Sequence, residues 1–204
     1  MMLLEFPFKS TKTYEEQFPV AYRQWRADSY CNVLHGYALS IHLEFGADSL
    51  DARNWIVDFG SLKPLKDQLC DWFDHTTLVA QDDPQREYLI GLRALKLAKI
   101  TEVERTGCEG IADFLFEHLN GADGWLKDHG YWPRVACTKV EVRETKSNMA
   151  MRCLTTADAY RLGYFKSPPP ADPVGMWMAA AGESVRFQNK GNDDPDLAAQ
   201  AERV

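Results

Sequence analysis

One pattern limits the possible folds of this chain more than any other. The segment from Tyr37 to Phe45 alternates strictly between apolar and polar side chains, which places one kind of side chain on each face of a β-strand. The segment 134–145 repeats the alternation, with Ala136, Thr138, Val140 and Val142 opposite Lys139, Glu141 and Arg143. Such one-sided strands are typical of an antiparallel sheet. We therefore predict an α+β fold, an antiparallel sheet covered on one face by helices.

Helices and further strands are expected around these two segments. Apolar side chains recur at helical spacing from Ser61 to Phe73, and helices are also predicted over about 85–100 and 109–119. A short strand is expected from Asn54 to Phe59, and a buried first strand from Met1 to Phe8. The sequence has neither βαβ alternation nor a glycine-rich phosphate loop, which argues against a dinucleotide-binding fold.

The composition divides the chain into a globular domain, residues 1–160, and a proline-rich acidic tail, residues 161–204. The tail contains too little apolar material to form a core, so we expect it to be partly disordered. If part of it docks onto the domain or onto a neighbouring subunit, the apolar stretch from Val174 to Ala181 is the segment expected to do so.

Charge and cysteine content narrow the range of partners. The chain has 23 Lys and Arg against 30 Asp and Glu, a net charge of −7, which argues against nucleic acid as a partner. No apolar run reaches the roughly 18 residues of a membrane span, and the N-terminus lacks signal-peptide features, so no membrane association is expected. Five cysteines without a CxxC pair indicate free thiols in a reducing cytoplasm.

Two short clusters combine residue types suited to proton transfer. His35 precedes the first strong strand and shares its apolar face with Tyr37, and Cys31 lies just before it. Asp74 and His75 follow a predicted helix, and an adjacent carboxylate raises the basicity of an imidazole near neutral pH. Each cluster also has a structural explanation: a hydrogen-bonded core histidine in the first, and a capping aspartate beside a surface histidine in the second.

A third cluster suggests the recognition of a ring. Glu144 continues the apolar face of Val140 and Val142, and a carboxylate on the buried side of a sheet must be paired. Such a carboxylate suits the adjacent N–H donors of a pterin or guanine; the alternative is a strand-end glutamate that turns to water. By contrast, Asp58 lies before a glycine at a strand-to-helix corner and is interpreted as a turn and cap residue.

Taken in chain order, five segments resemble the 6-pyruvoyl- and 6-carboxytetrahydropterin synthase family, which has the tunnelling fold. They are CNVLHGY from Cys31, IVDFGSLK from Ile56, FDHTTLV from Phe73, TGCEGIA from Thr106 and VEVRET from Val140. The corresponding family pattern has a Cys, three intervening residues and then His-Gly-His, followed by a Val-x-Asp-Phe-Gly stretch, Leu-Asp-His, Pro-Thr-x-Glu, and a strand-ending Glu-Thr. The match covers about two-thirds of the chain.

The resemblance implies a role for each matching residue. Cys31 would be the thiolate base that moves protons on the substrate side chain, and Asp74 and His75 would accept or return a proton. The residues implied to bind the pterin ring are Glu144, Thr145 and, in support, Glu109.

The resemblance also implies a zinc cofactor, which the family binds through three histidines. His35 matches one ligand, and Tyr22 and Tyr37 stand at the other two positions. Zinc normally prefers imidazole, thiolate or carboxylate ligands. His42 lies at an odd offset from His35 and faces the other side of the strand. A further alternative is a different metal bound by Cys31, His35 and His75.

Two functions follow from the resemblance. The first is a 6-carboxytetrahydropterin synthase-like lyase that acts on dihydroneopterin triphosphate in 7-deazaguanine (queuosine-type) precursor synthesis, favoured over the 6-pyruvoyl branch by the Cys-x-x-x-His-Gly spacing with Leu34 before the histidine. The second is a non-catalytic pterin-binding or structural member that has lost the zinc site. Family members close their sheets into trimers that stack into hexamers with active sites at subunit interfaces, so a homo-oligomeric barrel is expected.

Overall fold

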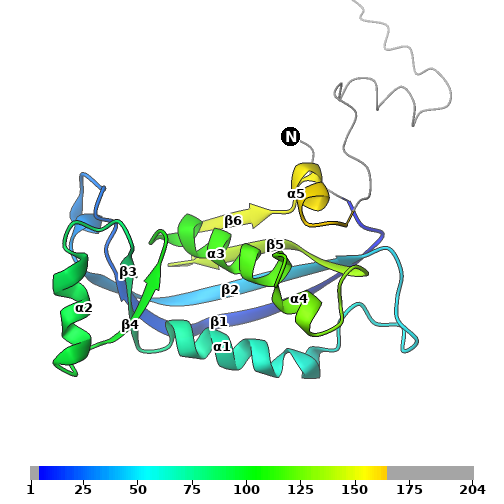
Figure 1. Cartoon of the computed structure of the whole chain (residues 1–204), viewed down its shortest axis with the longest axis horizontal. Coiled ribbons are helices and arrows are strands. Elements are labelled where there is room, and N and C mark those ends of the chain that lie inside the picture. The colour runs from blue at the N-terminus through cyan, green and yellow to red at the C-terminus, as the bar shows by residue number, and fades with distance from the viewer. Residues whose placement is uncertain (1–4, 165–204) are drawn as a thin grey trace, which may run out of the picture. The chain divides into compact units, whose positions relative to one another are not determined.

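The computed structural model describes residues 5–164 of the 204-residue chain. These residues form a six-stranded sheet with the strand order β4-β3-β1-β2-β5-β6, together with helices α1 to α5 (Figure 1). The strands are β1 Phe8–Tyr22, β2 His35–Ala47, β3 Thr76–Ala80, β4 Lys99–Val103, β5 Val135–Arg143 and β6 Met149–Cys153. The helices are α1 Lys63–Phe73, α2 Arg86–Ala94, α3 Cys108–Asn120, α4 Trp125–Asp128 and α5 Thr156–Arg161. Of the predicted tail, only residues 161–164 lie within the described range.

The sheet is mixed, and its larger part is antiparallel. Strands β1, β2, β5 and β6 pair antiparallel, whereas β3 pairs parallel with both β1 and β4. Parallel strands require a crossover, and here α2 connects β3 to β4. The helix expected over 85–100 therefore ends at Ala94, and its last predicted residues begin β4 instead.

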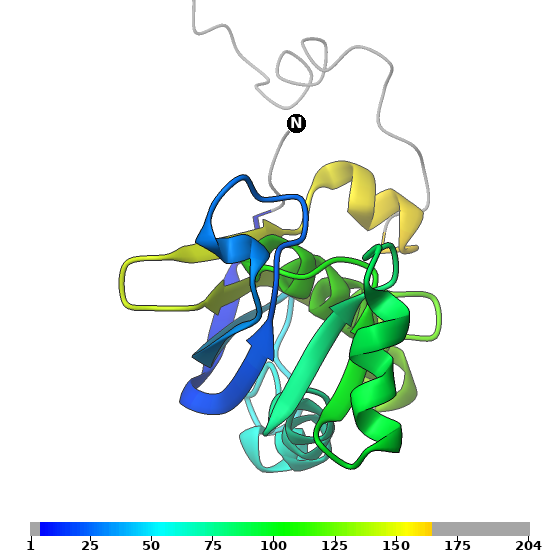
Figure 2. The same ribbon diagram turned by 90° about the vertical axis from the view of Figure 1, so that its left-hand side faces the viewer.

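Helices cover one face of this sheet, as predicted. Helix α1 packs on β1 and β3, and α3 packs on β5 and β6. The covered face of β2 consists of fully buried apolar side chains, namely Leu39, Ile41, Leu43 and Phe45. On the opposite face, His42 bonds Thr13 across to β1, with 2.6 Å between Nδ1 and Oγ1. Seen from its end, the sheet is curved (Figure 2).

Two predicted strands are not found among the described residues, and residues 1–4 of the strand predicted from Met1 to Phe8 lie outside that range. Residues 54–59 make a turn and the start of a short 3-10 helix, because the Asp51 carboxylate accepts the backbone N–H groups of Arg53 and Trp55 at 2.8 and 2.9 Å. Asp58 then caps the 3-10 helix by accepting from the Gly60 N–H, which is the structural role expected for it. The first strand begins only at Phe8, whose side chain is 40% exposed, so no buried strand occupies residues 5–7.

The predicted faces of β5 are wrong for part of that strand, because the strand contains a β-bulge. The register with β2 shifts between Glu44 and Phe45, which pair with Lys139 and Cys137 respectively. One extra residue reverses the alternation, so Cys137 joins Val140 in the core while Thr138 lies on the opposite face and donates a hydrogen bond to the Glu44 carboxylate at 2.7 Å. Thr138 and Val140 therefore do not share a face.

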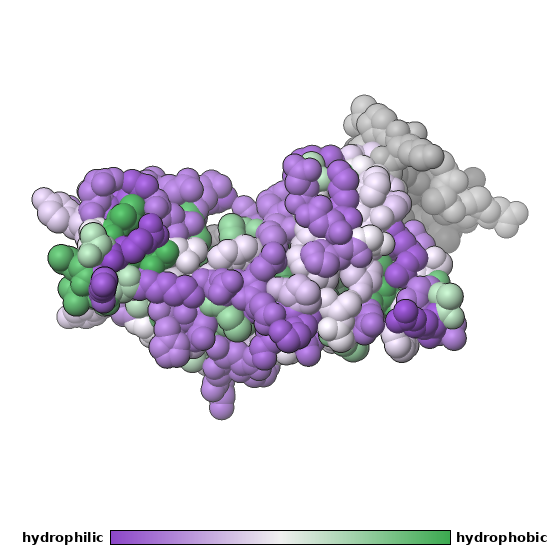
Figure 3. Space-filling model, turned by 60° about the horizontal axis from the view of Figure 1, so that its bottom comes forward, coloured by the Kyte–Doolittle hydropathy of each residue, from purple (hydrophilic) through white to green (hydrophobic). Residues whose placement is uncertain are grey.

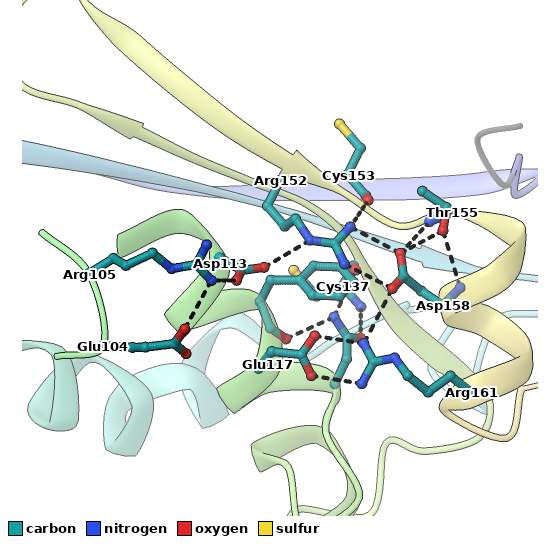
Figure 4. Close-up of polar contacts among 12 residues, drawn as sticks. Glu104, Arg105, Asp113, Glu117, Cys137, Arg152, Cys153, Thr155, Asp158 and Arg161 are labelled. Atoms are coloured by element: carbon teal, nitrogen blue, oxygen red, sulfur yellow. Dashed lines mark hydrogen bonds and ion pairs between the residues drawn. The ribbon is translucent and has the colours of Figure 1, made fainter. Parts of the chain in front are cut away.

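An ion-pair network attaches β6 and α5 to α3 (Figure 4). The Arg152 guanidinium bonds Asp113 at 3.0 Å and Asp158 at 2.8 Å, and Arg161 bonds Glu117 at 2.6 Å. Burial alone would raise the pKa of Asp158, but hydrogen bonds from Arg152 and from the Thr155 cap hold that pKa well below its ordinary value. This network fixes the C-terminal helix of the described domain.

The surface is largely hydrophilic on the face that Figure 3 presents, with hydrophobic side chains gathered at the end of the molecule that carries α2. Leu95 and Leu97, which follow α2, are 67% and 71% exposed. None of the helices within residues 5–164 is long and apolar enough to cross a membrane.

Candidate functional site

Three aromatic rings meet where β1 ends and β2 begins. Tyr22 is the last residue of β1 and pairs in register with His35, the first residue of β2. Because alternate residues of a strand share a face, Tyr37 lies beside His35 on the same side. The ring centroids of Tyr22 lie 5.9 Å from His35 and 5.6 Å from Tyr37, and those of His35 and Tyr37 are 5.1 Å apart. The structure thus brings together all three predicted metal-ligand positions.

Glu144 completes this cluster from the end of β5. The Tyr22 hydroxyl donates a hydrogen bond to the Glu144 carboxylate, and Tyr22 itself is fully buried. The backbone N–H of Glu144 bonds the Asn148 carbonyl at 3.1 Å, which fixes the residue at the start of the β5–β6 turn. The side chain thus points to the apolar side of the sheet, as the alternation predicts, and is paired there.

Cys31 lies on the loop that joins β1 to β2. It sits in a 3-10 helix, Tyr30–Asn32, and is half-buried. The Cys31 carbonyl accepts the Gln24 N–H at 2.8 Å. The start of the loop is held by Arg23, whose Nε lies 2.8 Å from the nearly fully buried carboxylate of Asp83. The thiol is therefore carried by an anchored loop.

Cys108, at the first position of α3, lies close to Glu144 and was not singled out by the sequence. Burial, together with the neighbouring Glu144 carboxylate, raises the pKa of the Cys108 thiol to about 12, so this thiol stays protonated and inert near neutral pH. The only local signal for it is its place inside the TGCEGIA segment. Glu109 follows it in the first turn of α3 and is exposed. Cys108 thus borders the Glu144 side of the cluster, and Glu109 lies beside Cys108.

Thr145 takes part in the turn after β5. Its hydroxyl accepts backbone N–H groups from Ser147 at 3.2 Å and from Asn148 at 3.0 Å. The hydroxyl thus shapes the segment that holds Glu144, and its side chain is exposed. Its predicted contact with the ring stays a prediction.

Asp74 and His75 lie directly before β3. His75 has a left-handed backbone (φ 51°), and its Nδ1 bonds the Asp74 carboxylate at 2.7 Å. The imidazole is mostly exposed and borders an open groove of about 500 Å³, together with Tyr37 and Lys99. Within residues 5–164, no hydrogen bond joins this pair to Cys31 or His35. One chain therefore forms the predicted carboxylate–imidazole pair but does not connect it to the thiol.

The donor set at the three ligand positions does not fit the zinc site of the family. It offers one imidazole and two phenols, and the His35 Nε2 already lies 3.1 Å from the Tyr37 hydroxyl. Metal ligands must be deprotonated, but burial, reinforced by Glu144, raises the pKa of Tyr22 and of Tyr37. No three His, Cys, Asp or Glu side chains of residues 5–164 are grouped to hold a metal. Cys31, His35 and His75 are accordingly not gathered into one such group within the described residues.

The chain thus combines a curved mixed sheet, helices on one face of that sheet, and a glutamate at the end of β5. The family model for 6-pyruvoyl tetrahydropterin synthase matches residues 11–152 of the 204, and the chain belongs to that family. No protein of curated function matches the sequence.

Solved structures are similar to this chain at low identity. An uncharacterised protein from Wolinella succinogenes, WS1659, is 19% identical with a TM-score of 0.61, over 72% of this chain and 97% of that one. The 6-pyruvoyl tetrahydropterin synthases of Plasmodium vivax and Caenorhabditis elegans are 15% and 17% identical with TM-scores of 0.48 and 0.46, over 72% and 75% of this chain and 99% and 100% of theirs.

Proposed function

We propose that this chain binds a reduced pterin through Glu144 and acts on dihydroneopterin triphosphate as a 6-carboxytetrahydropterin synthase-like lyase in 7-deazaguanine precursor synthesis. The observation that carries the proposal is the Glu144 carboxylate, which lies half-buried at the end of β5 and is held there by the buried Tyr22. Membership of the pterin synthase family gives this carboxylate its ligand class.

The chemistry of Glu144 suits a pterin ring. An ionised carboxylate has two oxygens with about four acceptor positions, and Tyr22 uses one of them. The remaining positions can accept adjacent N–H groups of the ring, and hydrogen bonds to a charged acceptor are stronger than neutral ones. The nearby Cys108 is buried and uncharged, so it supplies an apolar wall and no competing charge.

Proton transfer would fall to Cys31 and to the Asp74–His75 pair. Asp74 orients the imidazole through Nδ1, which leaves Nε2 free to exchange a proton with substrate. Because one chain does not connect this pair to Cys31, we propose that a homo-oligomer joins the Cys31 of one copy to the His75 of another. No step in this scheme uses zinc, since the donor set does not fit it.

A second candidate function is non-catalytic binding of a pterin. It is favoured by the ring cluster itself, in which Tyr22, His35 and Tyr37 are occupied by hydrogen bonds with one another and with Glu144. The two candidates share the binding site and differ in whether the side chain of the pterin is cleaved.

Incubation with dihydroneopterin triphosphate, with and without zinc, separates the two candidates when products are read by mass spectrometry. We expect 6-carboxytetrahydropterin from the unmodified chain and a loss of at least about 100-fold in rate on Cys31→Ala. Cys153→Ala is the matched control, because Cys153 is also a half-buried free thiol but lies on β6 and outside the site. Bound but uncleaved substrate would leave the binding function, and a protein that neither binds nor cleaves it would refute both.

A further inference from the structure

Tyr22 holds an unusual position in the candidate site. It stands where the family resemblance expects a metal ligand. Its hydroxyl instead donates a hydrogen bond to the carboxylate of Glu144, which lies 122 residues further along the chain. The residue is fully buried, and the Glu144 it contacts is only half-buried. One end of the hydrogen bond is therefore fixed by the core, and the other faces the site.

A second buried tyrosine of the same strand shows that burial alone does not explain this contact. Tyr14 is 2% exposed, and its hydroxyl has no hydrogen-bond partner among the described residues. The fold thus tolerates a buried phenol on β1 without a partner. The pairing of Tyr22 with Glu144 is a specific arrangement of this end of the strand.

His35 and Tyr37 complete the arrangement. The His35 Nδ1 lies 2.7 Å from the Val33 carbonyl and Nε2 lies 3.1 Å from the Tyr37 hydroxyl. Both ring nitrogens thus have partners without any metal. An imidazole held from both sides packs against the Tyr22 ring and supports it.

We propose that Tyr22 is a positioning residue that orients the Glu144 carboxylate toward a ring N–H, and that ligand binding at this site does not depend on a metal. This inference rests on the proposed pterin-binding function. It replaces a metal ligand by a phenol whose task is to hold the ring anchor.

The test is a titration with 7,8-dihydroneopterin after treatment with a chelator, and again with added zinc. We expect the same Kd in both arms for the unmodified chain, within about twofold. Tyr22→Phe removes only the hydroxyl and should weaken binding by about 10- to 100-fold, the usual cost of a hydrogen bond to a charged group. Tyr14→Phe, the matched control, should leave Kd unchanged. Glu144→Gln with Tyr22→Phe should bind no more weakly than Glu144→Gln alone.

Two results would overturn the proposal: loss of binding on chelation that zinc restores, or a Tyr22→Phe variant that binds like the unmodified chain. If the unmodified chain binds no dihydroneopterin in either arm, the proposed function fails. Thermal unfolding of the same variants then still tests whether Tyr22 and Glu144 interact. A combined loss of Tm smaller than the sum of the single losses supports the pairing, and additive losses contradict it.

Discussion

Two polar clusters of this domain are built in opposite ways. In the network around Arg152, each carboxylate faces a guanidinium, so positive and negative charges are paired throughout. Glu144 is a carboxylate whose side-chain partner among the described residues is the neutral hydroxyl of Tyr22. The charges of the Arg152 network are thus paired with one another, whereas the charge of the Glu144 carboxylate has no opposite charge as its hydrogen-bond partner among the described residues.

We propose that this difference separates a structural carboxylate from a ligand-binding one. A paired carboxylate such as Asp158 stabilises the fold and has little left to offer a ligand. A carboxylate oriented by a neutral donor keeps its charge and most of its acceptor positions. We therefore expect changes around Arg152 to act on stability alone, and changes around Glu144 to act on binding.

The largest effect is expected from restoring the metal site of the family. The double variant Tyr22→His with Tyr37→His would place three imidazoles at positions 22, 35 and 37, a ligand set that zinc prefers. We expect zinc affinity to rise by at least about 1,000-fold over the unmodified chain, measured by metal analysis and by cobalt absorption. Each single variant offers only two imidazoles and serves as the control. A double variant that binds no more zinc than the singles would show that these three positions do not converge on a metal.

The next effect concerns the proposed ring anchor. Glu144→Ala removes the carboxylate and should weaken binding of dihydroneopterin by at least about 100-fold, or about 3 kcal/mol. Its melting temperature should change far less than that of the Arg152 network variants. Calorimetric titration measures the binding. An unchanged affinity would show that a residue other than Glu144 binds the ring.

A smaller effect is expected in the paired cluster. Asp158→Asn leaves Arg152 without its charged partner on α5 and should lower the free energy of unfolding by about 2 kcal/mol. Pterin binding should stay unchanged, because Asp158 is not part of the candidate site. Denaturant unfolding provides the measurement. An equally stable Asp158→Asn variant, or one that loses pterin affinity, would remove the contrast between the two clusters.

The smallest effect is the pH dependence of that same stability. The pKa of Asp158 is lower in the folded chain than its ordinary unfolded value of about 3.9. Its contribution is therefore fully present above about pH 4 and is lost as the pH falls through the lower folded pKa. The stability difference between the unmodified chain and Asp158→Asn should shrink below about pH 4. A stability difference that persists at lower pH would show that it comes from packing and not from the charge of Asp158.

The sequence predicted what depends on local patterns. Alternation placed β2 and the buried direction of Glu144 correctly, and helical spacing located α1 and α3. The five motifs identified the family. Strand β3 was missed because all five of its residues are buried, so it shows no alternation.

What the sequence could not supply are contacts between distant segments. The pairing of Tyr22 with Glu144 spans 122 residues: the alternation required a partner for Glu144, but no local pattern identified Tyr22 as that partner. The bulge that reverses β5 comes from its register with β2, which alternation alone cannot reveal. The placement of His75 beside a groove that Tyr37 also lines likewise depends on where β3 joins the sheet.

The most direct test of the account is a crystal structure of the chain grown with dihydroneopterin and zinc. We predict the pterin ring with its N–H groups on the Glu144 carboxylate, the Tyr22 hydroxyl still bonded to that carboxylate, and no metal among Tyr22, His35 and Tyr37. A zinc ion bound by these three residues, or a pterin bound away from Glu144, would contradict it.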